Sequence, residues 1–144
     1  MRHVDFPDNM IAPLDAVKKA FGSTRNLTSQ EEADLQAAFD SYDRASGRGD
    51  AISPSVNFAG GLGTDFRNAY SQTYEKRRLA TLREQIKALV GNRCPRCGGS
   101  RPGTLDHHLP KSDYPEFAVY PKNLLACCQE CNGKKGQCVG ARLW

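Results

Sequence analysis

The sequence predicts an α+β protein, in which a mainly helical N-terminal region precedes a small module stabilised by metal. Two observations support this class. Apolar residues recur at helical spacing in two segments before residue 91, and all six cysteines lie beyond Arg93. A length of 144 residues is sufficient for one domain. We therefore expect a helical arm with a glycine-rich linker over residues 1–65, a connecting helix over 66–91, and the metal-stabilised module over 92–144.

The first predicted helix is SQEEADLQAAFDSYDR, starting at Ser29. Ser29 followed by Glu32 fits a capping box, in which each side chain bonds the other residue's backbone N–H. The apolar stripe of this helix consists of Leu35, Ala38, Phe39 and Tyr42. The opening segment, residues 1–27, reads as an arm with one short helix.

Residues 45–64 contain five glycines and a proline, so we expect a loop. This stretch lacks the glycine-lysine-serine/threonine pattern of a phosphate-binding loop. A second helix is predicted from about Asp65 to Val90, with Gly91 as its stop. Its apolar stripe shifts phase across residues 76–78, which indicates a kink or a break. The basic triplet there is either a phosphate-contacting face or a solvated one.

Charge is distributed unevenly along the chain. Residues 66–144 carry 14 Lys and Arg against 6 Asp and Glu, a net charge of +8, whereas residues 1–65 carry 6 against 10, a net charge of −4. A basic C-terminal half favours a polyanionic partner or is simply a solvated surface. The sequence has no apolar run of membrane-spanning length and no secretion signal, so we expect a cytoplasmic protein without a membrane partner.

Two CxxC pairs, Cys94/Cys97 and Cys128/Cys131, lie about thirty residues apart. Each pair forms a tight knuckle that directs two sulfurs to one centre, and two knuckles complete a tetrahedral zinc site. With four protein ligands the site is closed, so this Zn²⁺ is expected to be structural. Cys127 competes with Cys128 but would lengthen the second knuckle. Cys127 and Cys138 are simplest as small buried side chains.

Polar residues between and beside the knuckles remain: Asp106, His107, His108, Asn123 and Asn132. Taken singly, they could just hydrogen-bond the loops of a zinc ribbon. Together, CPRC, LDHHLPKS, PKNLLACC and CQECNGKK resemble the motif of the HNH endonucleases, a family of ββα-metal nucleases. The resemblance covers about residues 90–136.

The resemblance implies a role for each matching residue. Asp106 and Asn132 would bind a catalytic Mg²⁺ or Mn²⁺, His107 would be the general base, and Asn123 would orient the histidine-bearing segment. Oxygen ligands suit a hard cation, and a neutral imidazole can deprotonate water. Lys111, Lys134 and Lys135 are expected to contact nucleic acid.

Two alternatives concern the adjacent histidines. An ideal strand would place Asp106 and His108 on one face and His107 on the other, so the assignment requires irregular backbone. In a variant of the family, the first histidine of such a pair binds metal and the second is the base. We favour Asp106 with His107, because that variant needs further C-terminal histidines.

The resemblance implies hydrolysis of DNA phosphodiester bonds, with 5′-phosphate and 3′-hydroxyl products. Intact proteins of this kind and size resemble nucleases of phages, mobile elements and antiphage defence. The alternative function is a catalytically silent zinc-ribbon module that binds nucleic acid or protein. A third possibility is that a protein partner supplies recognition or switches the nuclease on.

Overall fold

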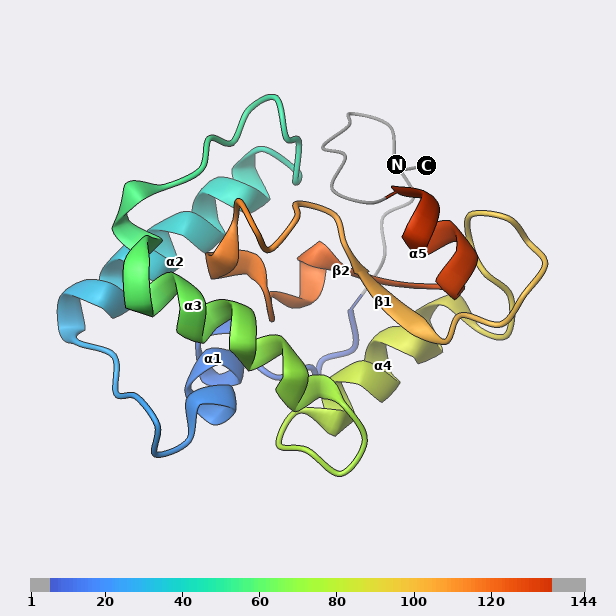
Figure 1. The fold of residues 1–144 in the computed structure, drawn as a ribbon, viewed down its shortest axis with the longest axis horizontal. Coiled ribbons are helices and arrows are strands. Elements are labelled where there is room, and N and C mark those ends of the chain that lie inside the picture. Colours follow the sequence, from blue (N-terminus) through green and yellow to red (C-terminus); the bar gives the residue numbers. More distant parts are fainter. Residues whose placement is uncertain (1–5, 136–144) are drawn as a thin grey trace.

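The computed structural model describes residues 6–135 and has an α+β fold, about half helical with one two-stranded antiparallel sheet (Figure 1). The α-helices are α1 (Pro13–Phe21), α2 (Ser29–Arg44), α3 (Gly60–Ala69), α4 (Ala80–Val90) and α5 (Gln129–Lys135). The strands are β1 (Thr104–His107) and β2 (Leu124–Cys127), and the 3₁₀ helices are η1 (Val56–Phe58), η2 (Tyr70–Thr73), η3 (Pro115–Phe117) and η4 (Pro121–Asn123). No helix within residues 6–135 is long and apolar enough to span a membrane.

The sheet is formed by β1 and β2, paired so that Thr104 faces Cys127 and His107 faces Leu124. Residues 108–123 connect the strands and contain η3 and η4. In Figure 1 this connection lies in the middle of the molecule, and α5 follows β2 directly. Both knuckles are therefore close to the strands in sequence, one before β1 and one after β2.

Helix α2 has the predicted stripe, with a corrected start. The capping box is formed by Thr28 and Glu31, one residue earlier than the predicted Ser29 and Glu32. The Glu31 N–H donates to Thr28 Oγ1 over 3.1 Å, and the Thr28 N–H donates to Glu31 Oε2 over 2.9 Å. Both pairs have the required spacing, so the pattern alone did not decide between them. Leu35, Phe39 and Tyr42 are buried, as predicted.

The predicted helix over residues 65–90 is wrong as a single element. It is split into α3, η2 and α4, with residues 74–79 outside any helix. A straight helix could not bury both halves of an apolar stripe that changes phase, so the chain breaks where the phase shifts. Gly91 ends α4 with a positive φ of 71°, as expected of a glycine stop.

The predicted loop over residues 45–64 also needs correction, because η1 and the first turn of α3 lie within it. Gly63 is required where α3 crosses the preceding backbone. A Cβ atom at this position would lie only 2.2 Å from the carbonyl oxygen of Phe58. Some of the glycines in this stretch therefore allow close packing of a helix.

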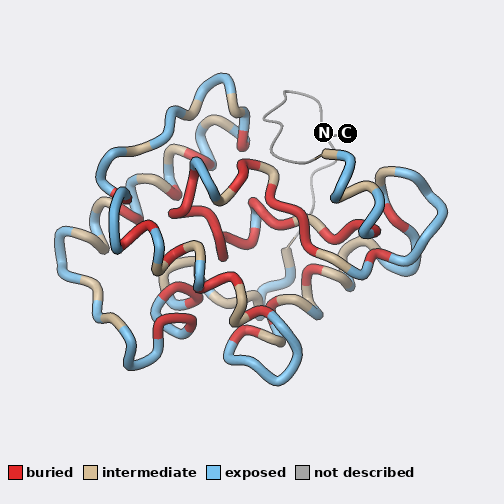
Figure 2. The backbone as a smooth tube through the Cα atoms, in the orientation of Figure 1, coloured by how far each residue is buried: buried red, intermediate tan, exposed pale blue. Residues whose placement is uncertain are grey.

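One apolar core contains residues from α1 through β2. Figure 2 shows buried backbone running through the centre of the molecule, along the 108–123 connection and the inner faces of the helices. Helices α2 and α3 both contact η3, and α4 contacts β2. The described part of residues 1–65 therefore packs directly on the segment that carries the candidate site. Cys138 lies outside the described residues.

Candidate metal centre and adjoining cleft

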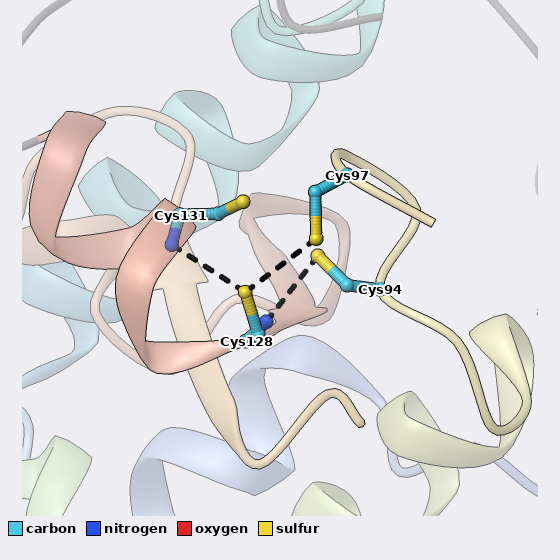
Figure 3. A group of neighbouring side chains, drawn as sticks. All are labelled: Cys94, Cys97, Cys128 and Cys131. Carbon is cyan, nitrogen blue, oxygen red and sulfur yellow. Dashed lines mark hydrogen bonds between the residues drawn. The ribbon is translucent and has the colours of Figure 1, made fainter. Parts of the chain in front are cut away.

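The four predicted zinc ligands converge. The sulfur atoms of Cys94, Cys97, Cys128 and Cys131 all lie within 4.8 Å of one another. The Cys97 and Cys128 sulfurs are 3.8 Å apart (Figure 3). Tetrahedral ligands at a Zn–S distance of 2.3 Å would be separated by about 3.8 Å. The cluster can therefore hold a zinc ion.

Backbone hydrogen bonds shape the two knuckles around these sulfurs. In the first knuckle, the Gly98 N–H donates to the Cys94 carbonyl over 2.8 Å. In the second, the Cys131 N–H points at Cys128 Sγ over 3.5 Å, and the Cys128 N–H points at Cys94 Sγ over 3.4 Å (Figure 3). Backbone donors aimed at sulfur stabilise thiolates, which are the form that binds metal.

The pKa values of these thiols diverge. Burial raises the pKa of Cys94, but backbone N–H donors, including that of Cys128, outweigh burial and lower it to about 6. The hydrogen bond to Cys128, with a contribution from burial, raises the pKa of Cys131 to about 12. Cys94 therefore loses its proton readily, whereas Cys131 keeps its proton. A divalent cation would replace the remaining protons and bring all the ligands to the thiolate form.

Cys127 is excluded from the cluster although it adjoins Cys128. Its side chain is fully buried, and its sulfur lies 3.9 Å from Thr104 Oγ1. Neighbouring residues of a strand point to opposite faces, so only one of the two sulfurs can face the first knuckle. Cys128 is the one that does, as the knuckle spacing predicted.

A cleft of about 640 Å³ lies beside β1 and contains several of the predicted site residues. The lining residues include Asp106, His107, Lys111 and Asn132. Arg67, Tyr70, Tyr74 and Arg83 also line it. Asp106 is the only acidic side chain among these described lining residues, whereas three of them are basic.

Asp106 is held by two cations. Its side chain is 5% exposed and is paired with Arg96, and its Oδ1 accepts from Lys135 Nζ over 3.3 Å. The Lys135 ammonium also donates to the backbone carbonyls of His107 and His108. Three oxygens thus converge on one cation, and the negative charge of the buried carboxylate is balanced.

His107 lies in the cleft next to Asp106, which an ideal alternating strand would not allow. It is the last residue of β1, at the point where the chain leaves the sheet. Its Nε2 is 2.9 Å from the Ala118 carbonyl, so Nε2 carries the proton and Nδ1 is left as the free base. Burial lowers the pKa of His107 to about 4, and the ring packs edge-on against Tyr70 at 4.6 Å.

His108 is turned elsewhere. Its Nε2 contacts the carbonyl oxygen of Gly47, in the loop after α2, and it is not among the cleft-lining residues. Its Nδ1 is buried and has no partner among the described residues. Burial also lowers the pKa of this histidine. The two adjacent imidazoles therefore have different environments, one facing the cleft and one fastening the connection to the N-terminal region.

Asn123 is fully buried under the segment that follows His107. Its Oδ1 accepts from the Leu109 N–H over 2.8 Å, and its Nδ2 donates to the carbonyls of Leu109 (3.0 Å) and Phe117 (3.2 Å). The hydroxyl of Tyr42, on α2, donates to the same Oδ1 over 3.3 Å. The Asn123 amide thus links the start of the 108–123 connection, next to His107, to the middle and the end of the same connection.

Asn132 extends from the first turn of α5, directly after Cys131. Its Nδ2 donates to Thr104 Oγ1 over 3.2 Å, which leaves its Oδ1 as the group able to bind a cation. Lys134 is exposed and pairs with Glu130 over 2.8 Å. Lys135, expected at a phosphate, has a side chain only 8% exposed and is directed at Asp106 instead.

Arg96 is a site residue that sequence reasoning missed. It lies between the two cysteines of the first knuckle, and its guanidinium reaches Asp106 and, over 3.5 Å, the Cys131 carbonyl. Its position inside CPRC could have indicated a role near the metal cluster, since the knuckle fixes the backbone from which the Arg96 side chain extends. Its contact with Asp106 could not be predicted in the same way, because that contact depends on how the strands pair.

The comparisons with known proteins give partial matches. Protein ea31 of Escherichia phage lambda is 49% identical over 59 residues, which is 40% of this chain and 20% of that protein. The Septu protein PtuB of Bacillus thuringiensis is 53% identical over 32 residues, which is 22% of this chain and 12% of that protein. No family model and no solved structure matches. The matched segment is thus a fifth or less of the length of each relative.

Proposed function

We propose that this protein is a metal-dependent endonuclease that hydrolyses DNA phosphodiester bonds, leaving 5′-phosphate and 3′-hydroxyl ends. The observation that carries the proposal is the shared cleft of Asp106, His107 and Asn132, whose described lining also includes three basic side chains and no second acidic one. A basic cleft attracts phosphates, and these three groups are the ones the HNH resemblance selects. The similarity to a phage lambda protein supports a role in phage biology.

In this proposal His107 takes a proton from the attacking water through Nδ1. The Ala118 carbonyl holds the tautomer in which that nitrogen is free. The low pKa keeps the imidazole neutral at pH 7, so the base does not have to lose a proton first. Asn123 acts by positioning, because it fixes the backbone of Leu109, two residues after the histidine.

The donor set fits a hard divalent cation. Asp106 offers a carboxylate and Asn132 an amide oxygen into the same cleft, and Lys135 already places a positive charge against Asp106 Oδ1. When bound there, Mg²⁺ or Mn²⁺ would supply charge stabilisation at the phosphate and the departing oxygen. Lys135 now lies against Asp106 Oδ1 and Arg96 against Oδ2, so one of these two cations would have to shift to make room for the metal ion.

The cysteine cluster supplies the scaffold in this account. Asn132 follows Cys131, and Arg96 follows Cys94 by two residues. Zinc in the cluster would hold α5 against the first knuckle, and so would set where Asn132 and Arg96 meet β1. Loss of zinc would therefore separate Asn132 from Asp106, the two proposed metal ligands, without directly changing the contacts of His107.

The contact of Asp106 with both Arg96 and Lys135 favours a second candidate function. A carboxylate balanced by two cations is stable without a metal ion, as in a zinc module that binds nucleic acid or protein and does not cleave. A protein partner that displaces Lys135 would reconcile the two functions, since the isolated chain would then bind DNA but cut it slowly.

Supercoiled plasmid cleavage distinguishes these functions. Zinc-loaded wild type should relax or linearise plasmid when Mg²⁺ or Mn²⁺ is added, and Asp106→Ala should not. Asp113→Ala is the matched control, since Asp113 is exposed and lies outside the cleft. End labelling of the products should reveal 5′-phosphates. Plasmid binding with no cleavage at any metal concentration would support the silent module, and equal cleavage by Asp106→Ala would refute the metal-ligand assignment.

A further inference from the structure

The cleft has an aromatic wall with no role in the hydrolysis proposed above. Of the aromatic side chains within residues 6–135, Tyr74 alone is exposed, with 49% of its surface accessible. It follows η2 and lines the cleft. An apolar ring left open to water beside basic side chains is the arrangement with which proteins stack nucleic-acid bases.

The ring of Tyr74 is held in place. It meets Tyr70 edge-on, with centroids 5.7 Å apart and planes at 76°. The Arg83 guanidinium lies 5.1 Å from the Tyr74 centroid. Arg83 itself donates to the Thr73 carbonyl over 3.1 Å and to the Tyr70 hydroxyl over 3.2 Å. A platform whose supports are already hydrogen-bonded loses little conformational freedom when a base stacks on it.

Tyr70 links this platform to the proposed general base. Its ring contacts both Tyr74 and His107, so the Tyr74 and His107 rings lie no more than about 10 Å apart. Its hydroxyl donates to the Leu105 carbonyl over 3.1 Å, which fixes it to β1. At the 3.4 Å rise of stacked DNA this span covers roughly three nucleotides, and fewer once the strand is unstacked.

The charges beside the platform suit a strand backbone. Arg67 and Lys111 line the cleft with Arg83, and Lys111 Nζ lies 4.9 Å from the Tyr70 centroid. Arg67 is anchored to the carbonyls of Lys111 and Ser112 over 3.2 and 3.0 Å. The phosphates of a bound strand would therefore meet fixed positive charge from residues that line the same cleft as Asp106.

We propose that the cleft takes DNA with an unpaired nucleotide next to the scissile phosphate, and that Tyr74 stacks on the base of that nucleotide. Bases inside a duplex are already stacked on both faces, so a ring on a cleft wall can reach only a base that is single-stranded, at an end or extruded. This substrate class rests on the proposed nuclease function and deepens it.

Binding without catalysis tests this substrate class. Zinc-loaded protein without added Mg²⁺ or Mn²⁺ is titrated with a short single strand carrying 2-aminopurine, and relaxed covalently closed plasmid serves as a fully paired competitor. Tyr74→Ala should weaken single-strand binding about tenfold and abolish the quenching of 2-aminopurine, since one base stack contributes about 1–3 kcal/mol. Tyr74→Phe keeps the ring and should bind within about twofold of wild type.

Val56→Ala is the matched control, because Val56 is 87% exposed and lies outside the cleft, and its affinity should equal that of wild type. For wild type, the plasmid should bind at least about tenfold more weakly than the single strand. The affinity for the plasmid should be the same in Tyr74→Ala as in wild type. Unchanged single-strand affinity in Tyr74→Ala would overturn the proposal. So would an equal loss in Tyr74→Phe, or plasmid binding as tight as single-strand binding. No cleavage is measured in this experiment, so its result does not depend on whether the metal site is active. Failure of the stacking test would likewise not change the outcome expected of the plasmid-cleavage test.

Discussion

The cysteine cluster and the cleft both adjoin β1, but different forces hold them. Cys94 and Cys128 of the cluster lie in a small buried group with Cys127 and the partly buried Cys131, separate from the main core, whereas Cys97 and the following residues up to 101 are exposed. The cleft walls instead join the main core through Tyr70 and Leu105. We therefore expect the cluster to depend on a bound metal ion for its stability, and the cleft wall that carries His107 to depend on packing against the helices.

The largest expected effect is loss of the metal scaffold. Cys128→Ser should lose zinc, which binds structural sites with about 10 kcal/mol or more, and should lose cleavage with it. The helical circular dichroism of α1–α4 should persist, because their core does not include the cluster. Zinc analysis, spectroscopy and plasmid cleavage on one preparation check all three.

Cys127→Ser is the matched control one residue away. Its sulfur faces Thr104 outside the cluster, so zinc should remain stoichiometric and stability should fall by only about 1–2 kcal/mol. If Cys127→Ser lost zinc and Cys128→Ser kept it, the ligand assignment would be reversed.

Asn123 tests the cleft wall that packs against the main core. Asn123→Ala should lower the free energy of unfolding by about 3 kcal/mol, because it leaves the buried N–H and the carbonyl of Leu109 without their partner and removes one of the two donors to the Phe117 carbonyl. Urea unfolding of the zinc-loaded protein measures this, and the zinc content should not change.

Asn132→Ala offers the contrast. This side chain donates a hydrogen bond to Thr104 Oγ1 at a partly exposed position, so its loss should cost less than about 1 kcal/mol while cleavage falls sharply. Equal destabilisation by both substitutions would remove the distinction between a positioning asparagine and a ligand.

A smaller effect is expected at Glu116, in η3 of the connection between the strands. Its side chain is buried, its Oε2 has no hydrogen-bond partner among the described residues, and burial raises its pKa from 4.5 to about 7. The folded state therefore holds this proton more tightly than the unfolded state. Its contribution to stability is fully present below about pH 4.5 and is lost as the pH rises from there through 7.

Glu116→Gln should remove that loss. The free energy of unfolding of the variant should gain about 2 kcal/mol relative to wild type between pH 5 and pH 8. Taking the difference between the two proteins at each pH cancels the titration of the histidines. A difference that stays constant from pH 5 to 8 would show that Glu116 is ionised throughout.

Local spacing predicted more of this molecule than long-range contact did. The four-cysteine cluster, the buried stripe of α2 and the stop at Gly91 all depend on residues a few positions apart, and all are present. The choice of Thr28 over Ser29 as the cap was undetermined, because both have a glutamate three residues on.

The features that escaped prediction depend on distant partners. The contact of His108 with Gly47 joins residues 61 positions apart, and the Tyr42 bond to Asn123 joins residues 81 apart. Tyr74 lies within the predicted helix over residues 65–90 but is exposed, because the chain breaks there instead of continuing as a helix. Arg96 meets Asp106 only because the first knuckle folds back onto β1.

The paired histidines give the most direct test of the account. Initial rates of plasmid cleavage in saturating Mg²⁺ or Mn²⁺ are compared for wild type, His107→Ala and His108→Ala, each verified for zinc content. The account predicts that His107→Ala cleaves at least about a hundredfold more slowly, the typical contribution of a general base, while His108→Ala stays near wild type. Equal rates for His107→Ala and wild type, or a loss confined to His108→Ala, would contradict it.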